Sequence, residues 1–241
     1  MISMIVPFYN ESSRFLDFKI KMNSYLKTNK WIKELLLVDD GSIDDTKELL
    51  RLYSIELNTN IICKVLHIQN NVGKGSAIKS AVFEATQNWI LCNDADLSYH
   101  PNQIDVWVDN NWINFQNINT LYFGSRTKGN LLYKQKLFYH RIFIGRIYSL
   151  LIKCVLGLNV PDTQCGFKLY PRVLARKIFL NVTENRFAFD IDVIAFSYKH
   201  SIKVDYLPVY CVETAGSKVN LIYDSWDMFK ALFRIRKKYS C

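Results

Sequence analysis

Trp89-Ile90-Leu91-Cys92-Asn93-Asp94-Ala95-Asp96 is an apolar run that ends in two carboxylates. A short apolar run bounded by polar residues predicts a buried strand, and residues at i and i+2 of an extended chain point to the same side. Asp94 and Asp96 can therefore reach one divalent cation and the diphosphate that it carries. An isolated Asp-x-Asp is more often a solvated turn, so its meaning depends on the rest of the chain.

Two further strand ends carry carboxylates, namely Val6-Pro7-Phe8-Tyr9-Asn10-Glu11 and Leu37-Val38-Asp39-Asp40-Gly41-Ser42. In an open parallel sheet such ends meet at the edge where ligands bind. Their carboxylates repel one another unless a cation or hydrogen-bond donors lie among them. Donors are offered by Asn70-Asn71-Val72-Gly73-Lys74-Gly75-Ser76, a glycine loop that opens a helix. It is not a P-loop, because Gly75 stands where that motif needs a magnesium-binding hydroxyl.

The first 125 residues alternate β-branched runs with helical patterns, which predicts an α/β fold with a mostly parallel sheet flanked by helices. We expect strands at 2–7, 34–39, 61–68, 89–93 and 121–124, and helices at 14–27, 44–54, 74–86 and 101–115. The second half is less regular, with helices at 136–156 and 188–200, a strand at 203–209 and a basic terminal helix. No internal repeat or low-complexity linker separates the halves, so we expect one domain over 1–241.

The composition indicates a folded protein whose surface attracts anions. Of the 241 residues 49% are hydrophobic, and the net charge is +9. A basic nucleic-acid-binding module would explain the charge but not the clustered carboxylates, which repel phosphate backbones, so no nucleic-acid partner is expected. The six cysteines form no Cys-x-x-Cys pair, which argues against zinc and for reduced thiols in the cytosol. The N-terminus has no signal-peptide pattern, and His140, Arg141, Arg146 and Lys153 interrupt the most span-like segment, 137–160.

Six motifs in a fixed order carry a resemblance to a known family. They are Val6–Glu11, Val38–Ser42, Asn71–Gly75, Asp94–Asp96, Gly124-Ser125-Arg126, and Asp162-Thr163-Gln164-Cys165-Gly166-Phe167-Lys168-Leu169. Over nearly its whole length the sequence resembles family 2 glycosyltransferases of the GT-A fold, and within them the dolichyl-phosphate β-glucosyltransferase branch. The Asp162–Leu169 string, Phe189-Asp190 and Gly216-Ser217-Lys218 favour that branch over the similar dolichyl-phosphate mannosyl synthases, which use GDP-mannose.

The resemblance implies that residues 1–125 bind a nucleotide-sugar and residues 126–241 an acceptor. It implies an inverting, metal-dependent enzyme that moves a hexose, glucose from UDP-glucose, onto a polyprenyl phosphate such as dolichyl or undecaprenyl phosphate. The implied nucleotide contacts are Pro7, Tyr9, Asn10, Glu11, Asp39, Lys74 and Asp94, with Asp39 at the base edge. Asp94 and Asp96 would hold Mg²⁺ or Mn²⁺. The implied acceptor and phosphate contacts are Arg126, Arg141, Gln164 and Lys218, and the implied catalytic residues are Asp96 and Asp162.

The chain departs from the family pattern at two positions. Ser98 stands where mannosyl synthases commonly have a glutamine that helps to bind metal, which leaves the third protein ligand open. Asp192 stands where the glucosyl branch usually has the glutamate of Phe-Asp-x-Glu, which leaves the role of that carboxylate open.

The chemistry explains these residue types. Both reactants are anions, so a cation held by Asp94 and Asp96 would stabilise the charge that grows on the leaving diphosphate. Arg126 would offer a forked donor to the acceptor phosphate. That phosphate is already ionised at neutral pH, with a second pKa of about 6. No strong base is needed, so Asp162 is expected to orient sugar or acceptor first and to act as a base second.

Two predicted helices have sequences that suggest contact with a membrane surface. In 136–156, Arg146 and Lys153 share one stripe and apolar residues cover most of the rest. In the last helix, Lys230, Arg234 and Lys237 form a stripe, with Lys238 beside it, opposite Met228, Ala231, Leu232 and Ile235. This pattern suits either an anionic bilayer or ordinary packing on the domain. We expect a peripheral protein at the cytoplasmic face of a membrane, with a membrane-anchored partner protein as a further option.

Two other glycosyltransferase functions remain open at this stage. One is a mannosyl synthase-like enzyme that uses GDP-mannose. The other is a soluble family 2 enzyme that glycosylates a glycan or a protein hydroxyl, a reaction that needs a true catalytic base.

Overall fold

The computed structural model describes residues 1–57, 60–133, 139–212 and 221–239. The strands are β1 (Ile2–Phe8), β2 (Ile32–Asp40), β3 (Ile62–Ile68), β4 (Trp89–Cys92), β5 (Thr120–Ser125), β6 (Lys168–Pro171) and β7 (Lys203–Pro208). The α-helices are α1 (Phe15–Leu26), α2 (Thr46–Glu56), α3 (Lys74–Glu84), α4 (Gln103–Asp109), α5 (Arg126–Tyr133), α6 (Tyr139–Leu156), α7 (Arg172–Asn181), α8 (Phe189–Lys199) and α9 (Leu221–Tyr239), and a short 3₁₀ turn, η1, covers Ser12–Arg14.

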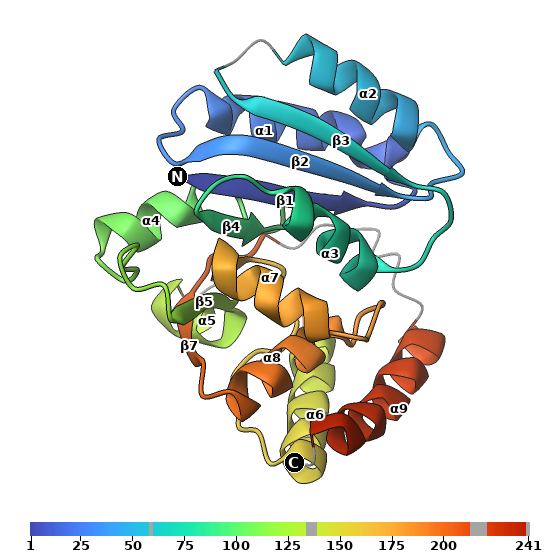
Figure 1. The fold of residues 1–241 in the computed structure, drawn as a ribbon, viewed down its shortest axis with the longest axis vertical. Helices are drawn as coiled ribbons and strands as arrows, with labels where there is room; N and C mark the ends of the chain where they lie inside the picture. The colour runs from blue at the N-terminus through green and yellow to red at the C-terminus, as the bar shows by residue number, and fades with distance from the viewer. Residues whose placement is uncertain (58–59, 134–138, 213–220, 240–241) are drawn as a thin grey trace.

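In the described part of the chain, seven strands form one sheet in the order β3-β2-β1-β4-β6-β5-β7 (Figure 1). The pairs β1–β2, β1–β4, β2–β3 and β5–β7 are parallel. Only β6 runs the other way, between β4 and β5. The mostly parallel α/β sheet expected from the sequence is confirmed.

Helices cover both faces of the sheet, which is why its central strands are apolar on both sides. Met4 and Val6 of β1 face a core built with α1, α2 and α4. Ile5, between them, faces a second core built with α3, α7 and α8. Residues of α6 and α9 extend this second core, so both helices belong to the same packed unit (Figure 1).

Several expected elements differ in the structure. The helix expected at 101–115 ends at Asp109, because the segment after it is rich in asparagine. Asn114 Oδ1 accepts from Gln116 N–H, and Asn117 Oδ1 accepts from Asn119 N–H. Such local bonds compete with the helix. The sequence patterns missed α5, β6 and α7, and β6 is only four residues long.

The structure also bears on the membrane and the cysteines. Within the residues that it describes, no helix is both long and apolar enough to cross a membrane. Four cysteines, Cys63, Cys92, Cys154 and Cys165, are free thiols.

Candidate active site

The carboxyl ends of β1, β2 and β4 lie at one edge of the sheet. The register places Phe8 of β1 beside Asp39 of β2, and Ile5 beside Cys92 of β4. The segments that follow each strand, 9–11, 41–42 and 93–96, therefore leave the sheet side by side. These are the three acidic strand ends that the sequence predicted to share one edge.

The segment after β1 is tied to the segment after β2. Asn10 has a positive φ of 53°, its N–H donates to Ser42 Oγ (2.9 Å), and its Oδ1 accepts from Ile43 N–H (2.9 Å). Glu11 N–H donates to Thr46 Oγ1 (2.7 Å). The Glu11 carboxylate accepts from both Nε and Nη2 of Arg14, and Tyr9 is 38% exposed. Pro7 is the last residue but one of β1.

Asp39 and Asp40 are both buried and both shape neighbouring loops. Asp39 accepts from Ser42 N–H (3.1 Å) and lies 2.6 Å from Nδ1 of His67. Asp40 accepts from the N–H groups of Val72 (3.1 Å) and Gly73 (2.8 Å) and so fixes the glycine loop. Burial and the charge of Asp39 raise the pKa of Asp40, and its net shift is upward although these two hydrogen bonds lower it.

Lys74 and Asp94 form an ion pair where the glycine loop meets the end of β4. Burial lowers the pKa of Lys74, whereas the negative charges of Asp94 and Asp190 raise it. The net shift of the Lys74 pKa is upward. Asp190, at the start of α8, pairs with buried Lys168 of β6. Burial raises the pKa of Asp190 by more than Lys168 lowers it. Two lysines and two aspartates therefore alternate across this part of the site.

Asp94 and Asp96 are the candidate ligands for a divalent cation. A Cβ at Gly166 would lie 2.2 Å from Asp94 Oδ2, so only glycine leaves room for this carboxylate. Asp96 Oδ1 accepts from Ser98 N–H (2.9 Å), which orients its side chain. The described residues contain no group of three or more His, Cys, Asp or Glu side chains placed to hold a metal. A two-carboxylate site suits Mg²⁺ or Mn²⁺, which complete their shell with water and substrate phosphate.

Arg126 and Asp162 form a forked ion pair at the start of α5. Nε and Nη2 of Arg126 each donate to a carboxylate oxygen at 2.8 Å, and Arg126 N–H donates to Oδ2 at 2.9 Å. Burial raises the pKa of Asp162, but Arg126 outweighs it, so the net pKa lies below the ordinary value. Gln164 N–H donates to the same carboxylate, and its Nε2 lies 3.4 Å from Met228 Sδ of α9.

The structure thus gathers Lys74, Asp94 and Asp96 in one place, and Arg126, Asp162 and Gln164 in another. Arg141 lies within α6, but its side chain is outside the description, and Lys218 lies outside the described residues. Sequence reasoning gave Lys168, Asp190 and Gly166 no role. The signal was present, because all three belong to the motifs Asp162–Leu169 and Phe189-Asp190.

Comparison with known proteins finds similarity to one enzyme family. The family model described as Glycosyl transferase family 2 matches residues 3–179. The chain is 32% identical to "Dolichyl-phosphate beta-glucosyltransferase" of Dictyostelium discoideum, over 99% of this chain and 74% of the relative. It is 28% identical to the human protein of the same name, over 99% and 75%. The fold is similar to Mycobacterium tuberculosis glucosyl-3-phosphoglycerate synthase in complex with Mn²⁺, UDP and phosphoglyceric acid. The TM-score is 0.67 at 15% identity, over 99% of this chain and 78% of that one.

Proposed function

Because the chain belongs to glycosyltransferase family 2, we propose that it moves glucose from UDP-glucose onto a polyprenyl phosphate with inversion at the anomeric carbon. An oxygen of the acceptor phosphate attacks that carbon, and the bond to the diphosphate breaks, so UDP leaves. Residues 1–125 bind the donor and residues 126–241 the acceptor. The relatives named dolichyl-phosphate beta-glucosyltransferase support this choice of donor sugar and acceptor.

The observation that carries the proposal is the Lys74–Asp94 ion pair, with Asp96 two residues further on. A bound Mg²⁺ or Mn²⁺ supplies Lewis-acid stabilisation of the leaving diphosphate. Asp94 and Asp96 would hold it, and Lys74 would add a positive charge on the same side. Pro7, Tyr9, Asn10, Glu11 and Asp39, at the ends of β1 and β2, form the nucleoside side of the site.

The state of Asp162 supports a phosphate acceptor over a hydroxyl acceptor. A hydroxyl needs a base to take its proton, whereas a phosphate is already ionised. Asp162 has a lowered pKa, and both of its oxygens accept hydrogen bonds from Arg126, so it is a weak base. Asp162 and Gln164 then orient the sugar or acceptor, while the acceptor phosphate approaches Arg126. Arg141 and Lys218 are proposed for the same phosphate.

The acceptor tail would keep the reaction at a membrane, and α9 supports peripheral attachment there. Met228, Ala231, Leu232 and Ile235 are buried, so the apolar face of α9 packs on the domain. The face directly opposite carries Trp226 (59% exposed), Lys230, Phe233 (49% exposed) and Lys237, with spacings of four, three and four. Aromatic rings and lysines of this kind suit the headgroup region of an anionic bilayer. We place the protein at the cytoplasmic face, with a membrane-anchored partner as an option.

The test is a donor and acceptor matrix. Purified protein with Mn²⁺ is assayed with UDP-glucose, UDP-galactose and GDP-mannose against dolichyl phosphate, undecaprenyl phosphate and a free glycan. We expect product with UDP-glucose and a polyprenyl phosphate. Product with GDP-mannose alone would assign the chain to the mannosyl alternative, and transfer only to the glycan would refute the lipid-phosphate acceptor.

A further inference from the structure

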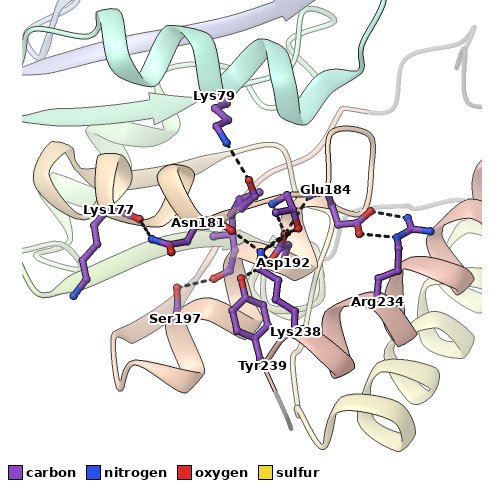
Figure 2. A network of polar contacts seen from close by, with 12 residues as sticks. Lys79, Lys177, Asn181, Glu184, Asp192, Ser197, Arg234, Lys238 and Tyr239 are labelled. Atoms are coloured by element: carbon purple, nitrogen blue, oxygen red, sulfur yellow. Dashed lines mark hydrogen bonds and ion pairs between the residues drawn. The ribbon is translucent and has the colours of Figure 1, made fainter.

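The loop between α7 and α8, residues 182–188, lies between the glycine loop and α9. We call it the α7–α8 loop. It contacts Ser76 and Lys79 of α3 on one side and the end of α9 on the other, although these segments are far apart in the sequence. Figure 2 shows the contacts with Lys79 and with α9. None of the roles described above involves it.

On the α3 side, this loop completes the start of the helix. The first N–H groups of a helix lack partners within it and need a cap. Gly73 stands at the capping position of α3 and makes no side-chain capping bond. Ser76 N–H instead donates to the backbone carbonyl of Asn185 (3.1 Å). The α7–α8 loop thus supplies the cap for the helix whose first residue is Lys74.

The approach is close enough to explain both glycines beside Lys74. A Cβ at Gly73 would lie 2.6 Å from Asn185 O, and a Cβ at Gly75 would lie 2.9 Å from the same atom and 2.5 Å from Phe189 Cβ. Gly73 also has a φ of 122°, which side-chain-bearing residues rarely adopt. The backbone on each side of Lys74 is therefore held against the α7–α8 loop.

On the opposite side, Asp192 holds the loop in place (Figure 2). Asp192 is fully buried, and its Oδ2 accepts from the N–H groups of Thr183 (2.7 Å) and Glu184 (3.2 Å). Lys238 Nζ lies 3.1 and 3.2 Å from the two carboxylate oxygens, and Tyr239 Oη donates to Oδ1. One carboxylate thus joins the α7–α8 loop to the last turn of α9.

A second anchor lies further out along the same helix. Nε and Nη2 of Arg234 donate to the Glu184 carboxylate at 2.8 and 2.7 Å (Figure 2). A surface groove of ≈ 500 Å³ runs beside the loop and is lined by Val72, Asn185, Arg186, Arg234 and Lys238, among others. Val182 and Ala188, at the two ends of the loop, are buried in the core, and the polar anchors hold the segment between them.

We propose that Asp192 and Glu184 are positioning residues for the donor site. They act through the α7–α8 loop, whose Asn185 carbonyl sets the start of α3 and with it Lys74. The inference rests on the proposed function, because the ligand positioned by Lys74 is the nucleotide-sugar diphosphate. It assigns Arg234 and Lys238, which the sequence suggested for lipid contact, to holding this loop.

Substitution at either anchor should loosen Lys74 without touching the nucleotide. Asp192→Asn replaces one accepting carboxylate oxygen with an amide nitrogen, which cannot accept a hydrogen bond. Some of the buried N–H donors around Asp192 are then left without a partner. Glu184→Gln removes only the forked pair with a half-exposed Arg234, so the fold should survive. Matched controls are Glu48→Gln, which removes the forked Glu48–Arg51 pair on α2, and Asp205→Asn, which removes the Lys203–Asp205 pair on β7.

Two measurements test the inference. The first is amide hydrogen exchange at Gly75–Ile78. The second is calorimetric titration of the full chain with UDP and with GDP in the presence of Mn²⁺. We expect faster exchange and nucleotide binding weaker by about tenfold in both anchor variants, within the range of coupling through packed networks. Both controls should match the wild type, and Asp192→Glu, which keeps the accepting charge, should bind more tightly than Asp192→Asn.

The results for the anchor variants either support or overturn the role of Asp192 and Glu184. Unchanged exchange in Glu184→Gln and Asp192→Asn overturns the inference, and so does faster exchange with unchanged nucleotide affinity. If Asp192→Asn does not fold, Glu184→Gln alone decides. A wild-type protein that binds neither UDP nor GDP refutes the proposed function together with this inference. A wild-type protein that binds, with variants that bind equally well, refutes the inference alone.

Discussion

Arg126 places its guanidinium fork on Asp162, with Nε and Nη2 each 2.8 Å from a carboxylate oxygen. The sequence suggested that this fork would face the acceptor phosphate and that Asp162 would lie beside the sugar. The structure joins the two side chains, so neither acts independently of the other. An incoming phosphate would meet an arginine whose orientation Asp162 already fixes.

The pair predicts non-additive kinetics. Arg126→Lys loses the fork and Asp162→Asn loses its charged partner, so each should lower kcat by about 10- to 100-fold, while donor affinity changes by less than about threefold. The double variant should be little worse than either single one, because both remove the same interaction. Steady-state kinetics and nucleotide titration measure this. Equal losses in donor affinity and turnover would place Arg126 on the donor instead.

Asp96→Asn should lower metal-dependent transfer about 100-fold. The variant weakens a two-carboxylate cation site, and a loss of about 3 kcal/mol of charge stabilisation corresponds to about 100-fold in rate. Activity is measured against Mn²⁺ and Mg²⁺ concentration, and folding by circular dichroism. Asp109→Asn, at an exposed position on α4, serves as the control. Full wild-type turnover in excess chelator would refute the role of the metal.

The Arg126–Asp162 pair also predicts how stability depends on pH. The folded-state pKa of Asp162 lies below its ordinary value of 3.8, so the folded protein binds fewer protons there than the unfolded chain. Its contribution to stability is present above that value and is lost as pH falls through the folded pKa. The difference in unfolding free energy between wild type and Asp162→Asn should therefore shrink below about pH 4. Urea unfolding at pH 3 to 7 tests this, and a constant difference would contradict it.

Membrane attachment should have an electrostatic part, from the lysines of α9, and an apolar part, from its exposed aromatic rings. Lys230→Ala with Lys237→Ala should remove about 2 kcal/mol of attraction to anionic vesicles, about 30-fold in affinity, and most of the salt sensitivity. Trp226→Ala with Phe233→Ala should weaken binding at high salt instead, because ring burial is not screened. Co-sedimentation with phosphatidylcholine vesicles, with and without phosphatidylserine, measures both.

The controls for that experiment lie on other helices. Lys47→Ala on α2 and Tyr198→Ala on α8 remove exposed side chains of the same kinds. Equal losses in the control variants would show that α9 has no special role. Point substitutions are preferable to removal of α9, since removal would expose Asp192 and disturb the α7–α8 loop.

Local sequence patterns were sufficient for most of the sheet and for the acidic strand ends that meet at one edge of it. β1, β2 and β4 are apolar because both of their faces are buried, so their runs and polar ends are visible in the sequence. Sequence patterns failed where a strand is too short to show periodicity, and where side-chain hydrogen bonds to the backbone compete with a helix. β6 has four residues, and the asparagines after Asp109 end α4 early.

By itself, the sequence determined the α/β class, the acidic strand ends and the positions of Lys74, Asp94 and Asp96, because strand periodicity and motif order are properties of neighbouring residues. Tertiary structure alone decided which charges meet. Arg126 and Asp162 are 36 residues apart, Lys168 and Asp190 are 22 apart, and Asp192 meets Lys238 across 46. Such pairs depend on how β6, α8 and α9 pack against the sheet, and no local pattern encodes that packing. For the same reason, only the folded chain showed that Arg234 and Lys238 hold a loop while Lys230 and Lys237 face outward.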